Sequence, residues 1–262
     1  MDKRENYLTP PVGLAGKDIF PWSYNRELSY LRRPVIRYQY DDGTVMCMFG
    51  FRSCIQAGIQ LSDLLYSGRL RYVGRKIETL LGKFEAIKGA AFNDEVRSFL
   101  AKIPIMRVWE HDVTIKSGGY FAADKDYGDI DVMAYDTSRD ILYLIECKNT
   151  NPAKNIKEMK TEMDEYLGRG DNPERDKKRA LVLKHLRRHR WVTEHINEVA
   201  KHIGVAVTPR VKSMMLTATV IPTSYLKREK IPMSILNYPE LKIKGVILLD
   251  SCKEPDLSVL DI

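Results

Sequence analysis

Two apolar runs joined by a short turn constrain the fold of this chain more than any other feature. Residues 128–136 read GDIDVMAYD, residues 140–149 read DILYLIECKN, and the turn-like TSR lies between them. Runs of this length and composition, bounded by turn residues, are typical of β-strands. With the strand-like run at 105–116, they predict a three-stranded β-meander.

Charged side chains interrupt these runs at one end of the predicted pair. Alternation places Asp129 and Asp131 on one face of the first strand, and Glu146 and Lys148 on one face of the second. Burying such groups costs free energy unless they are paired or bound to a metal. The carboxylates of Asp131 and Glu146, with the main-chain carbonyl of Cys147, would form an oxygen-rich site for Mg²⁺. Lys148 beside that metal could orient or deprotonate a water. The alternative is an exposed strand end with a Glu–Lys ion pair.

The rest of the chain divides into a smaller N-terminal region, 1–85, and a larger domain, 86–262. In the first region, residues 35–51 predict a β-hairpin around Asp42-Gly43, and residues 53–67 a helix capped by Ser53. The further elements are predicted as helices at 74–87, 90–102, 153–168 and 174–203, and as strands at 211–221 and 243–249. The fold class is therefore α/β, with an α+β accessory region at the N-terminus.

The motif GDIDV, followed after a short interval by IECK, resembles the PD-(D/E)XK nuclease superfamily. That resemblance covers roughly residues 86–250 and implies a restriction-endonuclease-like αβββαβ core with a mixed sheet. It also implies that Asp131 and Glu146 bind Mg²⁺ or Mn²⁺ and that Lys148 is the catalytic lysine. Asp129 occupies a position that is often a second acid in related sequences.

The helix before the meander departs from the pattern of that superfamily. Relatives often carry an acid there, in a pattern like KGxxFE, whereas residues 88–95 read KGAAFNDE. Asn93 stands where the acid is expected. Either Glu95 or Asp94 substitutes for it, or the site lacks this ligand. The sequence therefore does not decide whether a second metal ion is bound.

Positive charge is concentrated in a single segment. The chain carries a net charge of +7, and residues 175–190 (RDKKRALVLKHLRRHR) alone carry the same excess. Clustered Lys and Arg favour a polyanion such as nucleic acid. We therefore expect this segment to bind the DNA backbone through Lys184, Arg187, Arg188 and Arg190.

Aromatic and imidazole side chains accompany this basic segment. His185 and His189 have helical metal-ligand spacing, but among so many cations phosphate contact or solvent exposure is the favoured prediction. Trp191 could stack on a base, although packing against the sheet is favoured.

These features exclude several classes of protein and leave a nuclease or a nucleic-acid-binding module as the candidate functions. No apolar stretch approaches the length of a membrane span, the first residues lack a signal-peptide core, and the four cysteines form no CxxC pair. We expect a cytoplasmic, metal-dependent DNA endonuclease that serves host defence against phage or plasmids. Its N-terminal region would position the substrate, or contact a second subunit or a partner protein. The alternatives are a non-catalytic nucleic-acid-binding or scaffold module on a nuclease-like fold, and a repair, resolvase-type or RNA nuclease.

Overall fold

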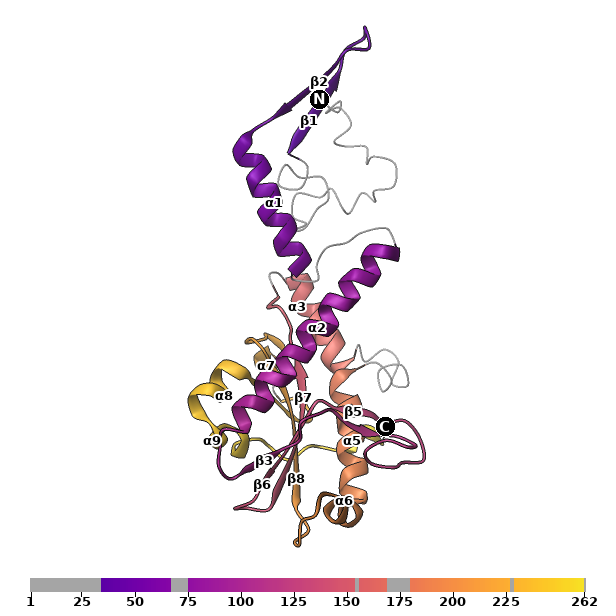
Figure 1. Cartoon of the computed structure of the whole chain (residues 1–262), viewed down its shortest axis with the longest axis vertical. Helices are drawn as coiled ribbons and strands as arrows, with labels where there is room; N and C mark the ends of the chain where they lie inside the picture. Colours follow the sequence, from indigo (N-terminus) through magenta and orange to yellow (C-terminus); the bar gives the residue numbers. More distant parts are fainter. Residues whose placement is uncertain (1–33, 67–74, 154–155, 169–179, 227–228, 262) are drawn as a thin grey trace. The chain divides into compact units, whose positions relative to one another are not determined.

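The computed structural model describes residues 34–66, 75–153, 156–168, 180–226 and 229–261. The chain divides into two compact units, residues 1–85 and residues 86–262 (Figure 1). The first 33 residues of the predicted N-terminal region and the basic residues 175–179 lie outside the described residues.

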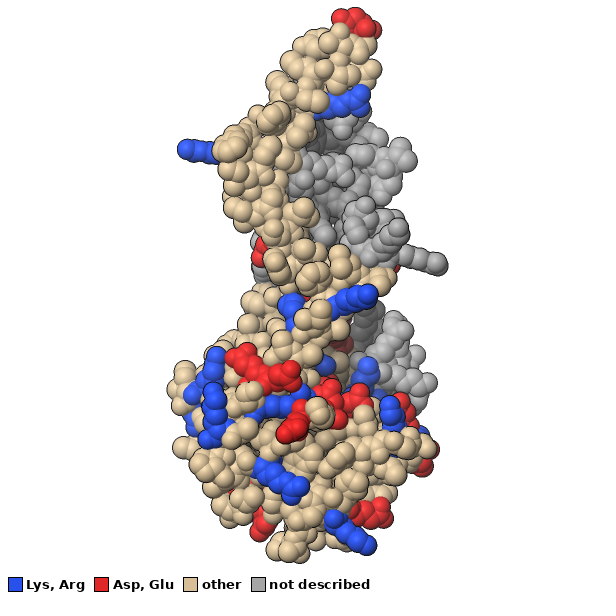
Figure 2. All heavy atoms as spheres, in the orientation of Figure 1, with Lys and Arg blue, Asp and Glu red and all other residues tan. Residues whose placement is uncertain are grey.

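The N-terminal unit contains the predicted hairpin. Strands β1 (Val35–Gln39) and β2 (Val45–Phe49) pair antiparallel around a turn in which Gly43 takes a positive φ of 85°. Helix α1 (Phe51–Tyr66) follows and begins before Ser53, so the prediction of Ser53 as the N-cap was wrong. Few charged side chains cover β1, β2 and α1 in Figure 2.

The C-terminal unit is mixed α/β, as predicted. Helix α2 (Arg75–Leu100) leads into it as one continuous helix, where two had been expected. Its strands are β3 (Met106–Val108), β4 (Val113–Ile115), β5 (Gly128–Ile130), β6 (Val132–Asp136), β7 (Ile141–Lys148), β8 (Arg210–Thr217) and β9 (Ser234–Asn237). Its remaining helices are α3 (Ile156–Leu167), α5 (Leu181–Glu194), α6 (Ile196–Ile203), α7 (Thr223–Leu226), α8 (Tyr238–Lys244), α9 (Val246–Asp250) and the 3₁₀ helix η3 (Ser258–Leu260).

A five-stranded mixed sheet forms the centre of this unit, in the order β3-β6-β7-β8-β9. The β3–β6 and β6–β7 pairs are antiparallel, whereas β7–β8 and β8–β9 are parallel. Strands β4 and β5 form a separate antiparallel pair. The predicted strand 128–136 is therefore divided at Asp131, where the chain passes from the small sheet to the large one.

Helices cover both faces of the large sheet, which explains why the β7 sequence is apolar on both faces. On one face, Tyr143 and Ile145 pack in a cluster with Phe92 of α2 and with residues of α8 and α9. On the other face, Leu142 and Leu144 pack with α5 and α6 (Figure 1). Trp191 lies in this second cluster at 4% exposure, so its predicted packing against the sheet is confirmed.

The C-terminal prediction of a strand over 243–249 was wrong, because two short helices occupy this segment. Asn237 caps α8, since its side-chain oxygen accepts a hydrogen bond from the N–H of Glu240 at 2.9 Å. Gly245, with a φ of 61°, separates α8 from α9. The Asn-x-x-Glu spacing is the local signal for this helix start.

The long helix predicted over 174–203 is divided in the structure. Helix α5 ends at Glu194 and α6 begins at Ile196, with the intervening His195 outside the helical range at φ −108° and ψ 22°. Gly204 ends α6 in the left-handed conformation.

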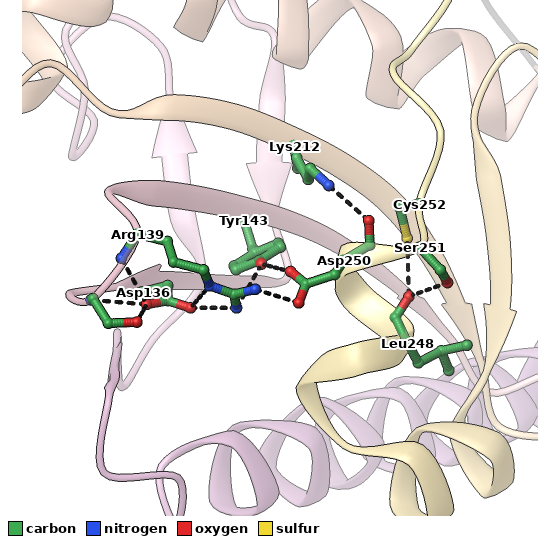
Figure 3. Close-up of polar contacts among 9 residues, drawn as sticks. Asp136, Arg139, Tyr143, Lys212, Leu248, Asp250, Ser251 and Cys252 are labelled. Atoms are coloured by element: carbon green, nitrogen blue, oxygen red, sulfur yellow. Dashed lines mark hydrogen bonds and ion pairs between the residues drawn. The ribbon is translucent and has the colours of Figure 1, made fainter.

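A polar network closes the sheet at the end where β7 begins (Figure 3). Arg139, in the turn between β6 and β7, forms ion pairs with Asp136 and with Asp250 of α9. The hydroxyl of Tyr143 donates to Asp250 Oδ1 at 3.0 Å. Lys212 of β8 donates to the main-chain oxygen of Asp250 at 2.9 Å. The network thus fastens α9 to the sheet.

Among the described residues, no helix combines the length and apolarity that crossing a membrane requires.

Candidate active site at the ends of strands β6 and β7

The candidate site lies at the opposite end of β7 from this network, where the strand becomes polar. The register pairs Val132 with Ile145, which places Asp131 opposite Glu146 just beyond the last paired residues. Asp131 Oδ2 accepts a hydrogen bond from the N–H of Cys147 at 2.8 Å. Lys148 Nζ lies 2.8 Å from Glu146 Oε1. The structure thus brings together Asp131, Glu146 and Lys148, as the sequence predicted.

Asp131 is the less neutralised of the two carboxylates. Burial and the negative charge of Glu146 together raise the pKa of Asp131 to about 7. Its single side-chain hydrogen bond within the described residues is the one from Cys147, and it involves only Oδ2. The carboxyl group of Asp131 is therefore about half protonated near pH 7, unless a further cation stabilises its charged form.

Glu146 is deeply buried and more strongly paired. Arg188 of α5 donates from Nη1 to its Oε2, and Lys148 binds its Oε1. Burial acts to raise the pKa of Glu146, but the charges of Arg188 and Lys148 outweigh burial and hold that pKa below its ordinary value. Burial likewise acts to lower the pKa of Lys148, and the charge of Glu146 outweighs it and raises that pKa. Both side chains are therefore charged at neutral pH.

Asp129 does not share the site face as expected. It lies on β5 opposite Thr114, and its side chain is exposed. The alternation that joined it to Asp131 fails because the chain bends between β5 and β6.

Helix α2 approaches the site through a residue that sequence analysis missed. Arg97 donates to the main-chain oxygen of Asp131 and forms ion pairs with Asp94 and Asp112. Asn93, one turn earlier, is 9% exposed. Glu95 is more than half exposed and lies 3.9 Å from Lys242 Nζ. It lines a cavity of about 340 Å³ with residues of α2 and α8 and with Asn149, which follows Lys148, but it has no contact with Asp131 or Glu146 among those of the described residues.

The basic helix α5 is less exposed than its sequence indicated. Arg188 has a side chain that is 11% exposed, and Arg190 pairs with Asp261 at 2.9 Å and donates to the main-chain oxygen of Leu257. Lys184 and Arg187 are half-buried. Arg187, Arg188 and Arg190 thus all have interactions within the protein, so the structure does not present the four residues as one continuous exposed track.

The prediction that His185 and His189 face phosphate or solvent was wrong. Both are buried, and burial lowers the pKa of each to about 4, so both are neutral at pH 7. His185 Nε2 lies 3.1 Å from the main-chain oxygen of Leu144, and its Nδ1 lies 3.7 Å from Glu146 Oε2 without a hydrogen-bond partner. His189 Nδ1 lies 2.8 Å from Ser213 Oγ.

The donor chemistry of the site fits a hard divalent cation. Asp131 Oδ1 accepts no hydrogen bond from the described residues, and two facing carboxylates repel each other unless a cation intervenes. Mg²⁺ is often held by one or two carboxylates and keeps several waters. Among the described residues, no three His, Cys, Asp or Glu side chains form a metal-binding group, so waters or substrate oxygens would complete the shell. The carbonyl of Cys147 as a ligand stays a prediction.

Comparisons with known proteins identify a family over most of the chain. The model of the family described as anti-phage protein Upx-like matches residues 1–234, and this range includes Asp131, Glu146, Lys148 and Arg188. No curated protein and no solved structure matches the chain. The expected role in defence against phage is thereby confirmed, whereas nuclease activity stays a prediction. The chain belongs to the Upx-like family of anti-phage proteins.

Proposed function

We propose that residues 86–262 hydrolyse phosphodiester bonds in DNA, with Mg²⁺ or Mn²⁺ as cofactor, and that this activity serves the defence against phage. The observation that carries the proposal is the incomplete compensation of the negative charge of Asp131 by its neighbours. Its carboxylate lies beside Glu146 at a strand end, with a pKa raised to about 7. Strongly perturbed titrating groups of this kind are concentrated at functional sites.

A purely structural ion pair accounts for Glu146 but not for Asp131. Lys148 and Arg188 already neutralise Glu146. The nearest guanidinium from α2 binds the main-chain oxygen of Asp131 rather than its carboxylate. The charge of Lys148 and the hydrogen bond from Cys147 act to lower the pKa of Asp131, but burial and the charge of Glu146 outweigh them, so the charged form of Asp131 remains costly to bury. This favours a site that binds a cation.

The order of the strands also supports the proposal. Helix α2 precedes an antiparallel set of three strands, β3, β6 and β7, with the small β4–β5 pair inserted after β3. Helices α3, α5 and α6 then lead to the parallel strand β8. The same αβββαβ order was expected from the resemblance to PD-(D/E)XK nucleases.

Each site residue then has a distinct task. Asp131 and Glu146 would hold the metal, which when bound neutralises charge on the scissile phosphate and lowers the pKa of an attacking water. Lys148 retains its proton, because its pKa is raised, so it would orient the water or the phosphate rather than remove a proton. Lys184 and Arg187 would contact the DNA backbone, and such contacts carry no sequence information.

The test is cleavage of plasmid DNA by the full chain, with the variants Asp131→Asn, Glu146→Gln and Lys148→Met. Each should lower the rate by about a hundredfold or more, because each removes a charge from the reacting centre. Asp129→Asn is the matched control, since it removes an exposed carboxylate two positions away. It should change the rate less than about twofold.

Three outcomes of this test separate the alternatives. Cutting that continues in excess chelator would contradict the metal requirement. DNA binding without any cutting would favour the non-catalytic module. Parallel reactions with single-stranded RNA and a four-way DNA junction identify an RNA nuclease or a resolvase, if only one of these substrates is cut.

A further inference from the structure

Arg188 holds the carboxylate that a metal would need. Its Nη1 donates to Glu146 Oε2, and its Nε donates to the main-chain oxygen of Tyr127 at 3.0 Å. The side chain is 11% exposed. The guanidinium thus joins α5 to β7 and to the segment that leads into β5.

Gly128 makes room for this guanidinium. A Cβ at position 128 would lie 2.9 Å from Arg188 Nη2 and 3.3 Å from its Nε, and the φ of Gly128 is +87°. The positive φ favours glycine at this position, and a side chain there would also have to displace the guanidinium of Arg188. The glycine of the GDID motif serves Arg188 rather than the acidic residues that follow it.

Charge balance makes Arg188 a competitor of a metal ion. Lys148 and Arg188 supply two positive charges, and Asp131 and Glu146 supply at most two negative charges. A divalent cation entering this cluster must take Glu146 Oε2 from Arg188 and leave an excess of positive charge. A DNA phosphate supplies a negative charge and accepts the paired hydrogen bonds that a guanidinium offers.

His185 does not substitute for Arg188. A carbonyl oxygen only accepts, so the contact of His185 Nε2 with Leu144 places the ring hydrogen on Nε2. The buried Nδ1 then presents a lone pair to Glu146 Oε2 at 3.7 Å and has no other partner. If Arg188 moves away, Oε2 loses its donor, and a cation becomes the favourable replacement.

We propose that Arg188 couples metal binding to DNA binding, by holding Glu146 in the free protein and transferring to a backbone phosphate when DNA binds. This proposal rests on the proposed function. Arg188 is thus a positioning residue that acts through Glu146. The metal affinity of the free protein is low, and the substrate raises it.

The test is calorimetric titration of Ca²⁺, which takes the same class of oxygen ligands as Mg²⁺, into the full chain with and without a DNA duplex. Wild type should bind Ca²⁺ about tenfold more tightly with the duplex, equivalent to about 1.4 kcal/mol. Arg188→Gln should bind Ca²⁺ in the free protein about as tightly as the wild-type complex does, with the effect of DNA reduced below about twofold. Arg188→Lys keeps the charge and should keep part of the coupling.

A second readout follows from linkage. Ca²⁺ must tighten DNA binding by the same factor, measured by fluorescence anisotropy. A variant Arg188→Gln that is less stable but keeps the full coupling would show that Arg188 has only a structural role. If Arg188→Gln does not fold, full coupling in Arg188→Lys and in Gly128→Ala would overturn the proposal. Absence of Ca²⁺ and Mg²⁺ binding in wild type, with and without DNA, would instead overturn the metal-dependent function.

Discussion

The two ends of β7 both carry charged side chains, but only at one end do the partners of the aspartate outweigh its burial. Where β7 begins, Asp136 accepts hydrogen bonds from Ser138 and forms an ion pair with Arg139. Arg139 also forms an ion pair with Asp250 (Figure 3). Burial acts to raise the pKa of Asp136, but these partners outweigh it and lower the pKa. Where β7 ends, Asp131 has one backbone donor and a pKa raised to about 7.

This difference distinguishes a carboxylate cluster that stabilises the fold from one that serves a function, at opposite ends of the same strand. A carboxylate with a lowered pKa contributes to folding in its charged form, because the folded state binds that form better. A carboxylate with a raised pKa opposes folding when it is charged. The partners of Asp136 outweigh its burial, whereas those of Asp131 do not. We therefore assign the first to the fold and the second to the site.

The largest expected effect is on stability at the first end. Asp136→Asn should lower the free energy of unfolding by about 2 kcal/mol at pH 7, because the buried side chain loses the charge that accepts hydrogen bonds from Ser138 and Arg139, although Arg139 keeps its ion pair with Asp250. Asp131→Asn should leave it unchanged or raise it, because it removes an uncompensated charge. Urea unfolding of both variants measures the difference. Equal losses would show that both clusters are structural.

The pH dependence of stability should have opposite signs at the two ends. The folded pKa of Asp131 exceeds its ordinary value of 3.8, so its contribution is full below about pH 4 and is lost as the pH rises to about 7. The folded pKa of Asp136 is lowered, so its contribution is present at neutral pH and is lost as the pH falls below the ordinary value.

The difference between wild type and Asp131→Asn isolates the first effect from that of the buried histidines, which have the opposite sign. From pH 4.5 to 7.5, wild type should lose on the order of 2 kcal/mol relative to this variant, a value discounted for partial exposure. Saturating Mg²⁺ should reduce this loss, because a bound cation stabilises the charged carboxylate. A difference that does not vary with pH would contradict the raised pKa of Asp131.

Local patterns predicted the strands that position the site. The hairpin at 35–51 and the strands around the TSR turn were confirmed, since alternation and turn residues act over a few positions. The strand expected at 243–249 was a helix, because a short apolar run does not distinguish the two. The helical start at Asn237 and Glu240 was the signal that decides it.

The partners of the site residues depend on contacts between distant segments. Arg97 reaches Asp131, and Arg188 reaches Glu146, only after the sheet and its two covering helices have formed. No local pattern indicates such pairs. For the two histidines of α5 the sequence held a weak signal of burial. Val192, Ile196 and Val199 form an apolar stripe at helical spacing, and His189 and His185 continue this stripe toward the N-terminus. That spacing predicts burial of both histidines.

The smallest expected effect concerns the DNA backbone. Arg188 is buried against Glu146 and Arg190 pairs with Asp261, so the prediction of phosphate contact in the free protein is tested at the half-buried Lys184 and Arg187 of α5. The double variant Lys184→Gln/Arg187→Gln should flatten the slope of log affinity against log salt by about two, since each neutralised phosphate contributes about 0.9. Lys201→Gln, which removes an exposed charge on α6, is the control and should leave the slope unchanged. The variants are compared on one duplex at several salt concentrations. An unchanged slope in the double variant would place the phosphate contacts on another element, and the comparison of the two ends of β7 would stand without them.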